Sequence, residues 1–80
     1  MKATVLVRPK SGILDPQGQA VEEALRHLGF HVGHARVGRL VDLELEATDP
    51  ADARAEVERM CAQLLANPLI ENYEIELEDA

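Results

Sequence analysis

The sequence predicts an α+β domain with the ferredoxin-like order β-α-β(β)-α-β, an antiparallel sheet with two helices on one face. Two segments open on Asp-Pro, at residues 15–16 and 49–50, and continue with apolar residues at helical spacing. Three other segments have the β-branched or alternating residues typical of strands, at 3–8, 32–47 and 72–78. With 80 residues, the chain is long enough for a single domain, 1–80.

Both predicted helices carry end signals. Asp15 can cap the first helix, Pro16 fits its first position, and Gly29 fits the residue after its end. The second helix starts after Asp49 and ends before Asn67-Pro68, because a residue before proline disfavours helical geometry. Each helix has one apolar stripe that we expect to be buried: Val21, Ala24, Leu25 and Leu28 in the first, and Ala53, Val57, Met60, Cys61 and Leu64 in the second.

The strand-like segment 32–47 is long and is interrupted at Gly38-Arg39. This dipeptide fits either a tight hairpin turn or a bulge in one long strand, and the sequence leaves both open. The segment 72–78 alternates strictly, so that Tyr73, Ile75 and Leu77 point inward and the glutamates between them point outward.

The formal net charge of −7 argues against nucleic-acid and anionic-membrane partners, which require basic surfaces. Residues 1–40 carry six basic and three acidic side chains, and residues 41–80 carry two basic and twelve acidic ones. The ferredoxin-like order would place the basic first strand between two acidic strands. On the helix-free face this arrangement exposes Leu6 and Leu40, so we expect a second copy to cover that face as a dimer.

The chain has one cysteine, no secretory signal and no apolar run long enough to span a membrane, which together predict a cytoplasmic protein. Its candidate reactive groups lack the neighbouring residues that catalysis or metal binding requires. Cys61 lies mid-helix without a neighbouring base, and Gly29-Phe30 would break the helix needed to align His27 and His31 with His34. The basic loop 8–12 lacks a phosphate-binding signature. We therefore predict no catalytic, metal-binding or cofactor-binding residues.

Several stretches together resemble the PurS family, small subunits of phosphoribosylformylglycinamidine (FGAM) synthase. The run from Val7 to Gly18, Val-Arg-Pro-Lys-Ser-Gly-Ile-Leu-Asp-Pro-Gln-Gly, is similar to the family's Lys-x-Gly-(Val/Ile)-x-Asp-Pro-Gln-Gly signature. Two further stretches match the family: the segment 36–39 and the run Met60–Tyr73 with its central Leu-Leu-Ala-Asn-Pro. In the first of them, the family often has lysine where this chain has Arg39. The resemblance covers nearly the whole chain.

The resemblance implies a non-catalytic subunit of a complex that makes FGAM from formylglycinamide ribonucleotide, ATP and glutamine. A homodimer or dimer of dimers would join a PurQ-type glutaminase to a PurL-type synthetase and assist ammonia transfer. The complex would use ATP and Mg²⁺, with neither bound by this chain. The segments expected to contact partners are Lys10–Gln17 and Asn67–Tyr73, which carry residues that match the family and that core packing does not require. The individual residues expected to make contacts are Lys10, Gly12, Asp15, Pro16, Gln17, Arg39, Asn67, Pro68 and Tyr73.

Two other functions share the predicted topology. One is a dimeric module that senses a small molecule, which would predict stabilisation of the isolated chain by its ligand. The other is a stand-alone enzyme of the acylphosphatase kind, which needs an anion-cradling loop that the segment 8–10 does not resemble.

Overall fold

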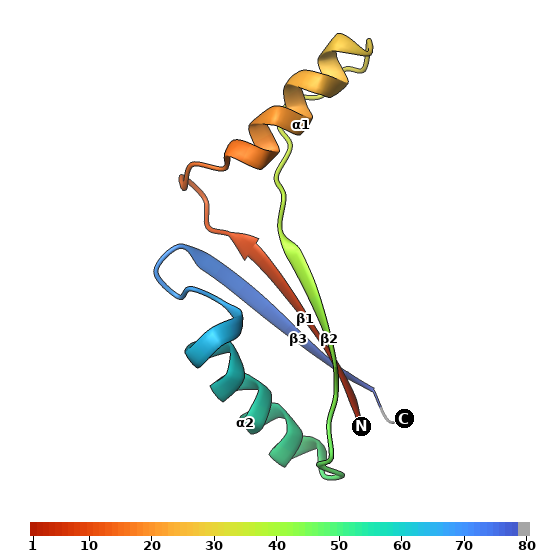
Figure 1. Cartoon of the computed structure of the whole chain (residues 1–80), viewed down its shortest axis with the longest axis vertical. Helices are drawn as coiled ribbons and strands as arrows, with labels where there is room; N and C mark the ends of the chain where they lie inside the picture. The colour runs from red at the N-terminus through yellow and green to blue at the C-terminus, as the bar shows by residue number, and fades with distance from the viewer. Residues whose placement is uncertain (79–80) are drawn as a thin grey trace.

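Strands and helices alternate along the chain in the predicted order (Figure 1). The computed structural model describes residues 1–78. Its elements are β1 (Lys2–Pro9), α1 (Pro16–His27), β2 (Arg39–Glu44), α2 (Pro50–Met60), the π-helical turn η1 (Cys61–Leu65) that continues α2, and β3 (Glu71–Glu78). None of the helices formed by these residues has the length and apolar character needed to cross a bilayer. The predicted α+β class and ferredoxin-like order are confirmed.

The sheet has the order β2-β1-β3, and β1 pairs antiparallel with both neighbours. The basic strand therefore lies between two acidic ones, as predicted. Arg8 of β1 forms an ion pair with Glu74 of β3 at 3.3 Å. Toward the other neighbour, β2, the Thr4 hydroxyl donates a hydrogen bond to Asp42 at 3.0 Å. These cross-strand contacts lie on the helix-free face and help to fix the register of the sheet.

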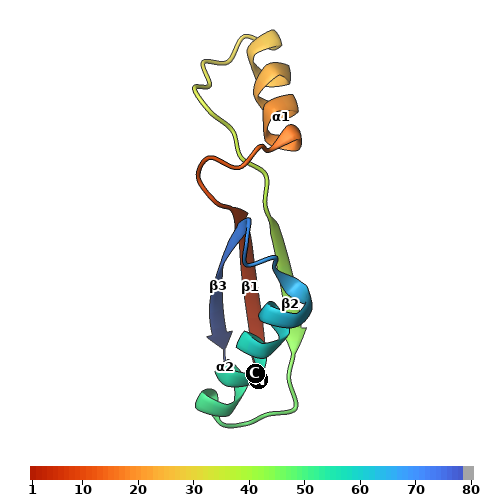
Figure 2. The same cartoon turned by 90° about the vertical axis from the view of Figure 1, so that its left-hand side faces the viewer.

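The buried core lies between β1 and α2 (Figure 2). Val5 of β1 belongs to the same buried cluster as Val57 and Cys61, and all three are fully buried. Cys61 is thus a core residue, and burial raises the pKa of its thiol. Most of the predicted stripe of the second helix is confirmed, but Leu64 is 82% exposed. It lies in the π-helical turn η1, which departs from the α-helical spacing of the stripe, and Leu65 packs against the core in its place.

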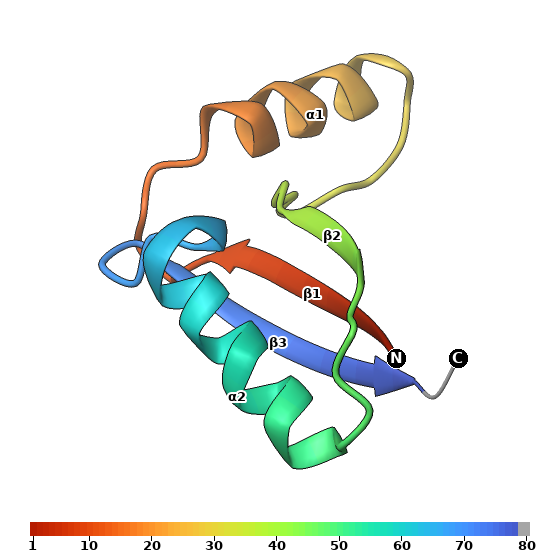
Figure 3. The same cartoon turned by 60° about the horizontal axis from the view of Figure 1, so that its bottom comes forward.

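The position of α1 differs from the prediction that both helices share one face of the sheet. In Figures 1 and 3, α2 lies along the sheet while α1 projects beyond its end. Its apolar stripe is consequently not buried within the chain, since Val21 is 42% and Leu28 73% exposed. The physical reason is that α1 is held by hydrogen bonds to the extended segment 32–38 rather than by packing on the strands.

The long strand expected at 32–47 is paired only from Arg39 to Glu44. Gly38-Arg39 forms neither a hairpin nor a bulge: the chain runs on through it, and Gly38 does not have a positive φ. Glycine is needed there for another reason, because a Cβ at Gly38 would lie 2.2 Å from the carbonyl oxygen of Val7. The predicted alternation is still present, with half-buried and exposed residues alternating from Val41 to Ala47.

Candidate protein-docking surface

Two loops that are far apart in sequence meet beyond the end of β1. The Lys10 amide donates a hydrogen bond to the Ile70 carbonyl at 2.9 Å. This bond joins the loop that leads into α1 to the turn that leads into β3. The structure thus brings together the two segments that the sequence predicted to contact partners, 10–17 and 67–73.

The loop 10–17 is shaped by a turn and a cap. The Ile13 amide donates to the Lys10 carbonyl at 3.2 Å, and Gly12, the third residue of this turn, has a positive φ of 83° that glycine adopts readily. Asp15 then caps α1, since its Oδ1 accepts from the Gly18 amide at 3.0 Å. The sequence prediction of this cap is confirmed.

Asp15 also ties α1 to the segment 32–38. Its Oδ2 accepts from the Val37 amide at 2.9 Å, and this bond, followed by the one from Gly18, holds the pKa of the Asp15 carboxyl below its usual range. A Cβ at Gly18 would lie 2.5 Å from the Ala35 carbonyl oxygen, so only glycine allows this close approach. The Asp-Pro-Gln-Gly sequence is therefore largely an anchor for α1.

The turn before β3 is organised by Asn67. Its side-chain oxygen accepts from the Leu69 amide at 3.1 Å, and its carbonyl accepts from the amides of Ile70 and Glu71 at 3.1 and 2.8 Å. Pro68 is the second residue of this turn, the position at which the fixed φ of proline is favourable. The turn leaves Leu69 82% exposed.

Arg39 holds this turn against β2. Its guanidinium donates to both carboxylate oxygens of Glu71, at 2.7 and 3.0 Å, and to the Leu65 carbonyl at 2.6 Å. The bidentate pair lowers the pKa of Glu71 and raises that of Arg39. Arg39, predicted as a partner contact, thus has a structural role within the chain, although its side chain is 50% exposed.

Between the two loops lies a hollow of about 330 Å³, which we call the docking groove. Leu14 on its wall is 72% exposed, and Ile70 on the other side is 41% exposed. Exposed apolar side chains around a groove are typical of protein–protein contact surfaces. The lining residues are Pro9, Ile13, Leu14, Asp15, Pro16, Gln17, Val37, Gly38, Arg39, Ile70 and Glu71.

The groove contains some of the predicted contact residues and excludes others. Asp15, Pro16, Gln17 and Arg39 line it. Gly12 borders a neighbouring hollow toward Ala35, while Asn67 and Pro68 shape the adjoining turn and Tyr73 lies on β3 opposite Val7. The residues predicted individually as contacts did not include the apolar lining residues Ile13, Leu14 and Ile70, although the Ile-Leu and Leu-Ile pairs lie inside the two predicted segments.

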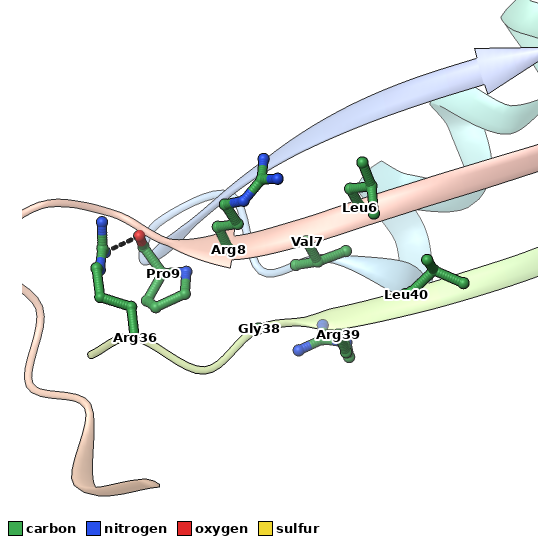
Figure 4. A pocket seen from close by; sticks show the side chains of 8 residues that line it. All are labelled: Leu6, Val7, Arg8, Pro9, Arg36, Gly38, Arg39 and Leu40. Atoms are coloured by element: carbon green, nitrogen blue, oxygen red, sulfur yellow. Dashed lines mark hydrogen bonds between the residues drawn. The ribbon is translucent and has the colours of Figure 1, made fainter. Parts of the chain in front are cut away.

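Leu6 and Leu40, predicted as a dimer face, border a second hollow of about 470 Å³ on the helix-free side (Figure 4). They are cross-strand partners, and Leu40 is 56% exposed. The three arginines around this hollow are already engaged: Arg8 with Glu74, Arg39 with Glu71, and Arg36 with the Pro9 carbonyl. Their guanidinium groups stabilise the ends of the strands.

Among residues 1–78, no three His, Cys, Asp or Glu side chains gather closely enough to hold a metal ion. His34 contacts Glu22 at 3.0 Å, which fastens α1 to the segment 32–38. The arrangement supports recognition of another protein through the docking groove.

Comparison with known proteins agrees with this geometry. The family model described as PurS, phosphoribosylformylglycinamidine (FGAM) synthase, matches residues 2–79. The PurS subunit of Methanocaldococcus jannaschii is 41% identical over 78 residues, covering 96% of this chain and 94% of the relative. The Bacillus subtilis subunit is 40% identical over 79 residues, covering 98% and 93%.

Solved structures show the same fold. The crystal structure of Methanocaldococcus jannaschii PurS superposes with a TM-score of 0.87 at 40% identity, covering 99% of this chain and 96% of that one. A chain of the PurLQS structure from Thermotoga maritima superposes with a TM-score of 0.86 at 36% identity, covering 94% and 93%. Sequence, length and fold all agree, and the chain belongs to the PurS family of FGAM synthase subunits in purine biosynthesis.

Proposed function

We propose that the chain is a non-catalytic assembly subunit, acting as a homodimer that holds a PurL-type synthetase and a PurQ-type glutaminase together and assists ammonia transfer between them. The relative from Thermotoga maritima is part of a structure titled PurLQS, which supports these two partners. The physical role is positioning, since two sites held together keep released ammonia from diffusing away and being protonated.

The observation that carries the proposal is the docking groove. Its two walls come from segments about 60 residues apart in sequence, and they are joined by the Lys10–Ile70 hydrogen bond. Leu14 and Leu69 stand beside the groove with most of their surface exposed. An apolar surface built with this many hydrogen bonds is rigid and costs little entropy to dock.

The cofactors and the location follow from the same proposal. ATP and Mg²⁺ act on the synthetase subunit, and this chain binds neither. A cytoplasmic location is proposed because ATP and glutamine are available in that compartment. Both statements depend on the complex rather than on a feature of this chain.

Reconstitution tests the proposal. The synthetase and glutaminase are assayed with and without this chain, using glutamine and then ammonia as the nitrogen source. We expect omission of the chain to abolish glutamine-dependent synthesis and to leave the ammonia-dependent reaction of the synthetase. Full glutamine-dependent activity without the chain would contradict the proposal.

A pair of variants tests the groove itself. Leu14→Asp places a charge on the groove, and Leu64→Asp places the same charge on a leucine that is also mostly exposed, 82% against 72%, but lies outside it. We expect the first to weaken binding to the other subunits by about tenfold or more and the second to leave binding unchanged. Equal effects of the two variants on affinity, measured by titration calorimetry, would exclude the groove as the contact.

A further inference from the structure

β3 is an edge strand, and no other strand formed by residues 1–78 covers its outer side. The sheet has the order β2-β1-β3, so β3 pairs on one side only. Figure 2 shows it at the margin of the sheet. A strand edge of eight residues presents a row of backbone amides and carbonyls that are free to pair with a further strand.

The hydrogen bonds of the sheet show which residues of β3 face outward. Along a strand, successive residues direct their backbone groups to opposite sides. The Lys10 amide donates to the Ile70 carbonyl at 2.9 Å, which extends the pairing of β1 with the even-numbered residues of β3. The Arg54 guanidinium agrees with this pattern, because it reaches the Ile75 carbonyl from α2 at 3.5 Å. The residues that direct their amides and carbonyls away from β1 are therefore Tyr73, Ile75 and Leu77.

The side chains of β3 indicate what kind of strand fits beside it. On the helix-free face the strand carries three exposed glutamates, Glu74, Glu76 and Glu78. On the other face Tyr73 is 38% exposed, and Ile75 packs against the core. Neighbouring side chains of opposite charge on adjacent strands stabilise a sheet. A complementary strand therefore has lysine or arginine beside the glutamates and apolar residues at the alternate positions.

We propose that the outer edge of β3 binds an extended segment of a companion subunit as an additional strand, in which basic and apolar residues alternate. In this mode of recognition the backbone hydrogen bonds supply affinity, and the alternate side chains supply specificity. The inference rests on the assembly role proposed above. It adds a contact outside the docking groove, whose lining includes no residue of the segment 72–78.

Charge makes a second copy of this chain a poor occupant of the edge. In a two-fold pairing of two β3 strands that continues the sheet, the glutamates of one strand lie opposite those of the other, and like charges in these positions are destabilising. β2, the other edge strand, carries Asp42 and Glu44 on the same face. Pairing β2 of one copy with β3 of another therefore also brings acidic side chains together, and the complementary charge comes from a different protein.

Hydrogen exchange at single residues tests the added strand directly. The full chain is measured alone and in the complex with the synthetase and the glutaminase, by mass spectrometry with electron-transfer fragmentation. In the chain alone we expect fast exchange at the outward amides of residues 73, 75 and 77, and slow exchange at Glu74 and Glu76, which face β1. In the complex we expect the outward amides to exchange roughly 100-fold more slowly, so that the alternation along β3 disappears.

A pair of charge variants tests the predicted basic side chains. Glu76 and Glu44 are both exposed, lie on the same face at opposite edges of the sheet, and form no ion pair within residues 1–78. We expect Glu76→Lys to weaken binding of the chain to the companion subunits by about tenfold and Glu44→Lys to leave it unchanged, as measured by titration calorimetry.

The outcomes separate this inference from the assembly role. A complex that assembles while the alternation of exchange along β3 persists overturns the inference and leaves the assembly role standing, as do equal effects of the two variants on affinity. Protection of the outward amides that appears in the chain alone as its concentration rises would identify a second copy as the occupant and overturn the inference too. A chain that binds neither companion overturns both.

Discussion

At the scale of the residue, three carboxylates hold together segments of the chain that lie outside the hydrophobic core. The Val37 amide lowers the pKa of Asp15, the Ala35 amide lowers that of Glu22, and the Arg39 guanidinium lowers that of Glu71. Each carboxylate accepts hydrogen bonds that only its charged form fully satisfies. Their ionisation is therefore coupled to the fold.

The stability of the chain should consequently fall in acid. The stabilisation from these groups is complete above their ordinary pKa values of about 3.9 for Asp and about 4.3 for Glu, and it is lost as pH falls through the lowered values of the folded state. Urea unfolding from about pH 7 to about pH 3 measures this loss. Asp15→Asn, which cannot titrate, should lose less stability in acid than the unchanged chain; parallel profiles would contradict the assignment.

Two glycines form a matched pair for testing backbone approach. A Cβ at Gly38 would lie 2.2 Å from the Val7 carbonyl oxygen, whereas one at Gly33 would meet nothing within 4 Å. We expect Gly38→Ala to lower the free energy of unfolding by about 1–3 kcal/mol, because β1 and β2 must separate. Gly33→Ala should be neutral or slightly stabilising in the same urea titrations. If the two variants unfold at the same urea concentration, the close approach of the Val7 carbonyl does not require glycine at position 38.

At the scale of the element, Arg39 joins the start of β2 to the turn before β3. Replacing it by methionine keeps the length of the side chain and removes its hydrogen bonds to Glu71 and Leu65. We expect amides 69–71 to exchange with solvent several-fold faster and those of β1 to stay unchanged.

Arg8→Met is the control for this prediction, since it breaks an ion pair between two side chains that are more than half exposed. Exposed pairs contribute little to stability, so exchange in the turn should not change. Faster exchange of the turn amides in Arg8→Met would mean that Arg39 has no special role there.

The elements were predicted well where the signal is local. The Asp-Pro openings predicted the starts of α1 and α2, and the alternation of residues 72–78 predicted β3. Ile75 and Leu77 pack against the core as predicted, whereas Tyr73, also predicted to point inward, is 38% exposed. The site was predicted in part, because residues 10–17 and 67–73 were chosen but their apolar members were not. Helical periodicity says that a stripe will be buried and does not say by which molecule, so the position of α1 could not be predicted. The Arg39–Glu71 pair joins residues 32 apart, and no local pattern reveals it.

At the scale of the whole molecule, α1 and the sheet do not share a core, since no residue of α1 belongs to the buried cluster of the described chain. The reactivity of Cys61 toward a thiol reagent measures the unfolding of the sheet, because this side chain is fully buried between β1 and α2. Its raised pKa makes the thiol still less reactive in the folded chain. In a dilute chain we expect the helical signal of α1 to be lost at lower urea than the protection of Cys61 from a thiol reagent. Circular dichroism and labelling kinetics measure the two transitions, and their coincidence would show that α1 and the sheet unfold together.

The central position of β1 affects how the protein is made. β1 is the first strand to leave the ribosome, yet one of its two edges is completed only by β3, after residues 71–78 have been synthesised. Until then that edge offers unpaired amides and carbonyls to other chains. The nascent polypeptide is therefore most prone to aggregate late in translation. Once β3 has paired with β1, the sheet ends in β3, whose glutamates disfavour pairing with another copy of the chain.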